Sequence, residues 1–79
     1  MDDYYKKYET YCQYFPEFNF KSGKDEIYFY LLHTEYPELN IYEEFKVFHI
    51  WILGINNPPP HLKLAFRSWL LRKRNKKET

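Results

Sequence analysis

The chain has 79 residues, which is enough for one small domain with one modest hydrophobic core. Its 9 Tyr, 7 Phe and 2 Trp side chains can each bury roughly 150–250 Å², which argues against wholesale disorder and against a need for metal or disulfide cross-links. The net charge of +1 conceals a strong polarity, because residues 1–54 are acidic and residues 55–79 carry seven Lys and Arg side chains against one Glu.

A first helix is predicted over residues 3–14. The residues expected on its apolar face follow helical spacing: Tyr4, Tyr8, Tyr11, Cys12 and Phe15. Asp2 or Asp3 can cap its N-terminus, and Pro16 ends it.

Residues 16–23 are predicted to form a loop whose two Phe side chains pack onto the core. Ser22 followed by Asp25 resembles a weak capping box, and a second helix is predicted over residues 24–34. The segment IYFYLLH within it has strand-like aromatic content, but no convincing second strand exists to pair with it. We therefore predict a helix here.

A third helix is predicted over residues 41–53, where Asn40 and Glu43 form an Asx-type capping box. Its apolar stripe consists of Ile41, Phe45, Phe48 and Ile52, widened by Val47 and Trp51. Gly54 is expected to end the helix in a left-handed conformation.

The segment NNPPP (residues 56–60) predicts an extended linker, with Pro60 in the first turn of a last helix over residues 60–74. The apolar face of that helix consists of Leu62, Ala65, Phe66, Trp69 and Leu70. Residues 72–79 form a basic tail. The expected architecture is one all-α domain over residues 1–79, a small bundle of three to four short helices with a Pro-rich linker before the last.

Nothing in the sequence predicts an enzyme. Phosphate-binding glycine loops, nucleophile elbows and zinc-binding helix motifs are all missing from the sequence. His33, His49 and His61 fall on separate elements, without a carboxylate or thiol at ligand spacing. The adjacent acids are expected to be solvated or to complement helix N-termini: Asp2-Asp3, Asp25-Glu26 and Glu43-Glu44. We predict no catalytic residue, metal, cofactor or small-molecule substrate.

The cellular compartment is predicted from the lack of a signal segment, a membrane-spanning segment and a disulfide pair. Its first residues, Met-Asp-Asp, have no apolar signal segment, and no apolar run approaches the roughly 20 residues that cross a bilayer. The single thiol of Cys12 cannot form an internal disulfide and is expected to be buried and inert. We therefore expect a soluble cytoplasmic protein that does not bind membranes.

The basic last helix is the strongest candidate for a binding site. Cations that follow phosphates, beside aromatic rings that stack on bases, are typical of single-strand binding. Trp51, Trp69 and several Tyr side chains could offer stacking faces, but Trp69 lies in the apolar stripe and is expected in the core. The predicted nucleic-acid-binding residues are Lys63, Arg67, Arg72, Lys73, Arg74, Lys76 and Lys77. The competing interpretation is that these charges serve only the helix dipole and solubility. Lys63 and Arg67 lining a groove with an exposed aromatic would favour nucleic acid, whereas pairing of these two cations with acids of the same chain would count decisively against it.

Residues 36–74 also carry an ordered set of motif residues. They are Tyr36-Pro37, Glu44, Trp51, Asn57-Pro58, Phe66, Trp69-Leu70 and Arg72. This pattern resembles a C-terminal module of phage and plasmid replication-initiation and helicase-loader proteins, the DnaT/DnaD-type primosomal group. The resemblance implies binding of single-stranded DNA or of a replisome protein such as a replicative helicase. The linker differs from the family's, the preceding residues match nothing in it, and no ATPase motif is present.

Three functions follow from these observations. The leading prediction is a small DNA-replication accessory module that binds nucleic acid, single-stranded DNA rather than duplex. The alternative is a phage-type adaptor or inhibitor that docks on a replisome or host protein through exposed aromatic residues. A helix-turn-helix regulator of duplex DNA is less supported, because the basic helix lacks a polar N-terminal face that reads bases.

Overall fold

The computed structural model describes the backbone of residues 5–78 and the side chains of residues 5–76. Its elements are α1 (Lys6–Tyr11), the 3₁₀ helix η2 (Pro16–Phe18), α2 (Lys24–Glu35), α3 (Ile41–Gly54) and α4 (Leu62–Glu78). No strand occurs between residues 5 and 78, so the predicted all-α bundle is confirmed with four α-helices. None of these helices has the length and apolar character needed to cross a bilayer.

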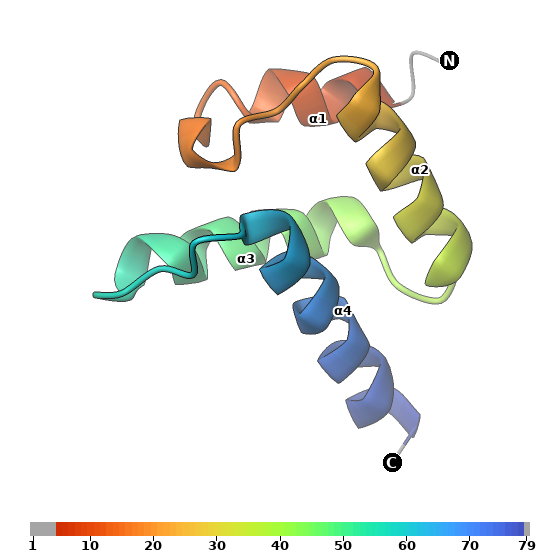
Figure 1. Cartoon of the computed structure of the whole chain (residues 1–79). Coiled ribbons are helices and arrows are strands. Elements are labelled where there is room, and N and C mark those ends of the chain that lie inside the picture. The colour runs from red at the N-terminus through yellow and green to blue at the C-terminus, as the bar shows by residue number, and fades with distance from the viewer. Residues whose placement is uncertain (1–4, 79) are drawn as a thin grey trace.

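The helices are arranged around α3. In Figure 1, α1 lies at the top, α2 descends from it, and α3 runs back beneath α1. α3 packs against α2 and α4, and α4 also meets η2. α4 crosses α3, and its C-terminal end projects below the other helices in this view. The last turns of α4 therefore extend beyond the core.

α1 is shorter than the predicted helix over residues 3–14. The α-helix ends at Tyr11, and the chain continues in a tighter turn with hydrogen bonds that span three residues. In this turn the Tyr14 N–H donates to the Tyr11 carbonyl and the Phe15 N–H donates to the Cys12 carbonyl. This turn brings Phe15 fully into the core and leaves Tyr14 exposed. Asp2 and Asp3, the predicted caps, lie outside the described residues.

α2 begins differently from the predicted Ser22–Asp25 capping box. Gly23 occupies the N-cap position with φ of 86°, a left-handed value that glycine adopts at little cost. The Glu26 carboxylate accepts hydrogen bonds from the Gly23 N–H and the Ser22 hydroxyl. Asp25 instead accepts from the Lys21 N–H at 2.6 Å. Asp25 and Glu26 are buried rather than solvated, and they complement the N-terminus of α2, which is the second of the two roles expected for the acid pairs.

α3 begins as predicted but ends differently. The Asn40 side chain accepts a hydrogen bond from the Glu43 N–H at 3.2 Å, which confirms the N-cap. Gly54, however, is the last helical residue and has no left-handed conformation. The chain leaves the helix through Ile55, which is extended (φ −100°, ψ 151°) and packs against the core. This packing turns the chain without a left-handed residue.

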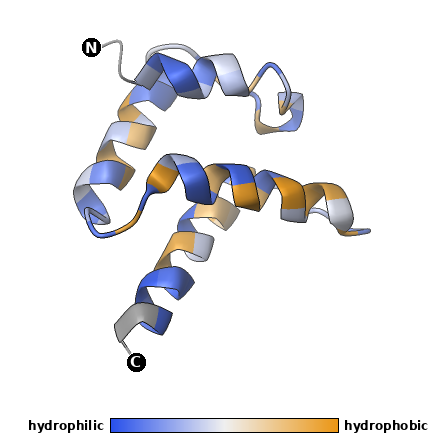
Figure 2. Cartoon of the chain, turned by 180° about the vertical axis from the view of Figure 1, so that it is seen from behind, coloured by the Kyte–Doolittle hydropathy of each residue, from blue (hydrophilic) through white to orange (hydrophobic). Residues whose placement is uncertain are grey.

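The apolar stripe of α3 is narrower than predicted. Ile41, Phe45, Phe48 and Ile52 are buried, as expected. Val47 and Trp51, which were expected to widen the stripe, are 46% and 40% exposed. With Ile50 and Leu53 they leave an apolar outer surface, and Figure 2 shows hydrophobic residues recurring along α3.

α4 starts later and ends later than the predicted helix over residues 60–74. The first helical bond runs from the Ala65 N–H to the His61 carbonyl, so Pro60 precedes the helix instead of occupying its first turn. At the other end the helix continues to Glu78. Lys and Arg are good helix formers, and the basic residues near its end complement the helix dipole, so the expected tail is helical.

The core is built largely from aromatic rings around Phe45. This ring is fully buried, and its centroid lies 5.0 Å from Phe18, 5.1 Å from Phe29 and 5.2 Å from Phe66. The first half of the chain contributes Tyr8, Phe15 and Phe18, and Phe20 packs against the core with partial exposure. The predicted packing of both loop Phe side chains is confirmed.

Tyrosines of α1 contact two histidines, of which His49 is buried and His33 is half-buried. The Tyr8 hydroxyl lies 2.6 Å from His33 Nε2, and the Tyr11 hydroxyl lies 2.8 Å from His49 Nδ1. The His49 ring also stacks on Phe15 at 4.0 Å, and its buried Nε2 has no hydrogen-bond partner among the described residues. Burial lowers the pKa of His33, with the Lys7 charge adding to the effect. Burial also lowers the pKa of His49, partly opposed by Glu17.

These lowered pKa values predict acid-sensitive stability. Unfolded histidine titrates near pH 6.5, so below that pH the unfolded chain binds protons that the folded chain excludes. The stabilisation is complete above about pH 6.5 and is lost as the pH falls toward the folded pKa values. The melting temperature should therefore fall between neutral pH and about pH 5, above the range in which most carboxylates titrate. His49→Gln should flatten the profile, and an equally steep profile in that variant would contradict the assignment.

A candidate nucleic-acid interface on α4

The orientation of α4 is set by two fully buried residues, Phe66 and Leu70. The Phe66 ring lies 5.2 Å from Phe45 and 5.1 Å from Phe48, so this side of α4 faces α3. The remaining positions of the helix are then divided between a face turned toward α2 and a face turned away from it. The predicted basic residues fall on both.

The α2-facing side begins with Lys63. Its ammonium lies 3.3 Å from a carboxylate oxygen of the buried Asp25 and 5.0 Å from the centroid of the Phe18 ring. The Lys63 carbonyl accepts a hydrogen bond from the Tyr28 hydroxyl at 2.7 Å. Lys63 therefore joins the start of α4 to α2 and η2.

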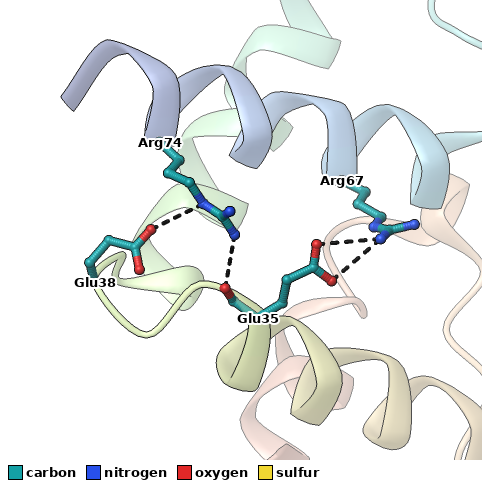
Figure 3. Close-up of polar contacts among 4 residues, drawn as sticks. All are labelled: Glu35, Glu38, Arg67 and Arg74. Atoms are coloured by element: carbon teal, nitrogen blue, oxygen red, sulfur yellow. Dashed lines mark hydrogen bonds and ion pairs between the residues drawn. The ribbon is translucent and has the colours of Figure 1, made fainter. Parts of the chain in front are cut away.

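Arg67 and Arg74 continue this side toward the C-terminus (Figure 3). Arg67 lies 3.3 Å from a Glu35 carboxylate oxygen, and Arg74 lies 3.3 Å from a Glu38 carboxylate oxygen. Arg74 also donates to the Glu35 carbonyl at 2.9 Å and lies 4.2 Å from the centroid of the buried Tyr36 ring. Both guanidinium groups thus bind the C-terminal end of α2 and the turn that follows it.

Three of the predicted phosphate contacts are therefore engaged within the chain. Lys63, Arg67 and Arg74 follow a spacing of four and seven residues, which places them on one side of the helix. Their acidic partners all come from α2 and the turn after it. Because these cations are paired with acids of the same chain, the ion pairs count against a role for the three side chains in nucleic-acid binding.

The second side of α4 carries Trp69, Arg72, Lys73 and Lys76, which we call the open basic face. These residues line a hollow of about 220 Å³. The Lys73 ammonium lies 5.6 Å from the centroid of the Trp69 ring, within the range of a cation–π contact. Arg72 and Lys76 are exposed, and Lys73 is half-buried. This face combines cations with an aromatic ring, as the sequence predicted for α4 as a whole.

Trp69 is oriented by α3. Its indole N–H donates to a Glu44 carboxylate oxygen at 3.0 Å, and its ring lies 5.6 Å from Phe48 and 5.7 Å from Trp51. Trp51 remains 40% exposed beside it. The two tryptophans of the chain therefore meet at the base of the open basic face.

The structure divides a site that the sequence treated as one. It brings Arg72, Lys73 and Lys76 together and places the other described cations of α4 elsewhere, while the side chain of Lys77 is not described. The helical spacing of the two groups was visible in the sequence. The sequence offered Trp51 as a possible stacking ring and also placed it in the apolar stripe of the third helix, and its 40% exposure distinguishes the two.

Neither a metal site nor a reactive thiol is found among residues 5–76. No group of three or more His, Cys, Asp or Glu side chains in this part of the chain could hold a metal ion. Burial, reinforced by the Asp25 charge, raises the pKa of the Cys12 thiol to about 12, so the thiol is protonated at neutral pH. Cys12 is buried, as predicted.

Comparison of the chain with protein-family models, with curated proteins and with solved structures found no match. The resemblance to the primosomal group therefore stays a prediction. Several of its motif residues have a structural role here, since Trp69 is bound by Glu44 and stacks near Trp51.

The division of α4 predicts opposite roles for two neighbouring arginines. Arg74→Ala removes a guanidinium–ring contact, an ion pair and a hydrogen bond, and should lower the free energy of unfolding by about 1–2 kcal/mol. Arg72→Ala, the matched control on the same helix, should change it by less than about 0.5 kcal/mol. Thermal and urea unfolding followed by circular dichroism would measure both. Equal losses in the two variants would contradict the division.

Proposed function

We propose that this protein is a small module that binds single-stranded nucleic acid through the open basic face of α4. The observation that carries the proposal is the grouping of Arg72, Lys73 and Lys76 around Trp69, next to the exposed ring of Trp51. Arg72, Lys73 and Lys76 follow Leu70, the last buried residue among those described, while Trp69 packs against the core. The open basic face is accessible without unfolding any element.

The electrostatics favour an anionic ligand at this place. The acids that pair with Lys63, Arg67 and Arg74 lie on the α2-facing side of α4. At the open basic face Glu44 lies against Trp69, and its carboxylate is bound by the indole. Lys and Arg side chains that bind phosphates release condensed counterions, which is the main source of affinity for nucleic acids.

The aromatic component favours a single strand. A base can stack on an exposed aromatic ring only when it is unpaired, and such stacking tolerates any sequence because every base has a π-face. Trp51 supplies the exposed ring, and Trp69 supports it from behind at 5.7 Å. A duplex would use the cations but not this ring.

A role in DNA replication is part of the proposal. It is supported by the resemblance of residues 36–74 to primosomal modules, which implies a single-stranded DNA ligand and a replisome partner such as a replicative helicase. The structural grouping of Glu44, Trp51, Trp69 and Arg72 agrees with a common site for these motif residues. The chain itself supplies the binding function in this proposal, and the partner supplies the ATPase.

Fluorescence anisotropy of labelled oligonucleotides tests the proposal. Binding to a single strand should weaken steeply with salt, and each lost phosphate contact should reduce the slope of log K against log salt by about 0.7. Arg72→Ala should reduce the slope by that amount, whereas Arg74→Ala should leave it unchanged at temperatures where both variants are folded. Duplex of the same sequence should bind more weakly.

A charge-matched control distinguishes binding at a defined site from a general effect of net charge. The exposed lysines Lys6, Lys21 and Lys24 lie in the first half of the chain and do not line the open basic face. Replacing all three by Ala removes as much charge as replacing Arg72, Lys73 and Lys76. Only the second triple variant should lose binding. Equal loss in both, or no salt-dependent binding by the wild type, would refute the proposal.

A second function, docking on another protein, is favoured by a groove between α2 and α4. This groove has a volume of about 610 Å³, and its walls include Leu31 and Leu64, which are 56% and 64% exposed. Apolar residues with such exposure are common in protein interfaces when they form one patch. The groove lies on the α2-facing side of α4, so the two surfaces can be separated by mutation.

The double variant Leu31→Glu/Leu64→Glu tests this second function. Both positions are exposed, so the variant should fold and should keep its affinity for oligonucleotides if the open basic face binds them. Proteins retained by the immobilised wild type but not by the variant, identified by mass spectrometry and then tested in purified form, would establish docking. Identical retention by both proteins would exclude this groove as a docking site.

A further inference from the structure

A second hollow lies directly beside the open basic face. It has a volume of about 670 Å³ and is formed where the end of α3, the Pro-rich linker and α4 meet. Trp51, Ile55 and Pro59 provide its apolar lining. Two exposed polar residues of the linker, Asn56 and Asn57, also line it.

The chemistry of this lining matches that of an unpaired nucleobase. A base has flat apolar faces and a polar edge, and proteins that bind single strands stack the faces on aromatic rings and bind the edge with polar side chains. The Trp51 ring can meet a face. An asparagine amide presents a donor and an acceptor side by side, so it can bind a base edge with two hydrogen bonds.

The two hollows share one lining residue, Arg72. Arg72 lines the hollow beside Trp51 and also the hollow formed with Trp69, Lys73 and Lys76. A guanidinium at this boundary can hold a phosphate, with the attached sugar and base directed to one side. The cations and the hollow beside Trp51 are therefore neighbours that share Arg72, as a nucleotide strand crossing both would require.

We propose that the hollow between Trp51 and the Asn56–Asn57 linker is a subsite for one unpaired nucleobase. The phosphates of the same strand contact Arg72, Lys73 and Lys76, so this inference rests on the proposed function. The base stacks on Trp51, and the linker amides bind its edge. Because a paired base cannot expose its face and Watson–Crick edge together, the subsite selects single strands and gives a preference among bases.

An abasic oligonucleotide tests the subsite apart from the phosphate contacts. The same single strand is prepared with all bases present and with abasic sugars throughout, so the phosphates are identical. The abasic strand should bind with the same salt slope but about 5- to 150-fold more weakly, which is the effect of losing one stacked base. Binding is measured by competition against the labelled intact strand.

A thermodynamic cycle locates the lost contact. Trp51→Ala should weaken binding of the intact strand by a similar factor and should not weaken binding of the abasic strand further. Tyr30→Ala is the matched control, because Tyr30 is 47% exposed but lies on α2, outside both hollows. Replacing Asn56 and Asn57 by Ala should abolish differences in affinity among homopolymers without changing the salt slope.

Each alternative result has a separate meaning. If the abasic strand binds as tightly as the intact strand, the subsite is wrong while the proposed phosphate-binding function stands. If the abasic strand binds weakly and Trp51→Ala weakens its binding further, a base binds at another part of the protein and the subsite is also wrong. If neither strand shows salt-dependent binding, the proposed function fails and the subsite fails with it.

Discussion

The rotation of α4 about its own axis is the constraint on which the candidate site depends. Phe66 and Leu70 are fully buried, and the Phe66 ring meets Phe45 and Phe48 of α3 at 5.1–5.2 Å. Burying two such side chains contributes several kcal/mol, far more than any exposed ion pair. The aromatic contacts therefore orient the helix, and the charges must occupy whatever sides remain.

Acidic residues of α2 and of the turn after it complete this division. Asp25, Glu35 and Glu38 meet Lys63, Arg67 and Arg74 in the order in which the two helices run past each other. The opposite charges of the two halves of the chain are thus partly an internal feature of the fold. The cations that stay outside these pairs, Arg72 and Lys73 among them, lie where the chain also exposes an indole ring. α4 therefore supplies both the cations that pair with acids inside the fold and the cations of the positive outer surface.

Local sequence rules account for much of this fold. The Asn40 cap and the spacing of Phe45, Phe48 and Ile52 predict α3, and helical spacing predicts the buried side of α4. The errors fall where tertiary contacts decide. Ile55 packs against the core and turns the chain without a left-handed Gly54, and the buried positions of Asp25 and Glu26 depend on contacts with Lys21, Ser22 and Lys63.

Tertiary contacts that local sequence rules do not predict matter even more for the candidate site. Its residue types and their place on the last helix follow from the sequence, because a run of cations beside Trp69 is visible there. Helical spacing also separates Arg72 from Arg74, but it does not show which of the two sides of α4 meets the acids of α2. The sequence leaves Trp51 open between the apolar stripe and an exposed stacking ring, because its exposure depends on how the helices pack, and the ring is 40% exposed.

The linker between α3 and α4 restricts the site as well as the fold. Residues 56–60 include three prolines, which lower the conformational entropy of the unfolded segment and restrict its path in the folded state. A segment of this kind holds Asn56 and Asn57 beside Trp51 at a lower entropic cost than a flexible loop would. Preorganisation of this sort reduces the ordering cost that a ligand must overcome on binding. The linker that sets the angle between two helices thus also fixes one wall of the hollow into which a base would insert.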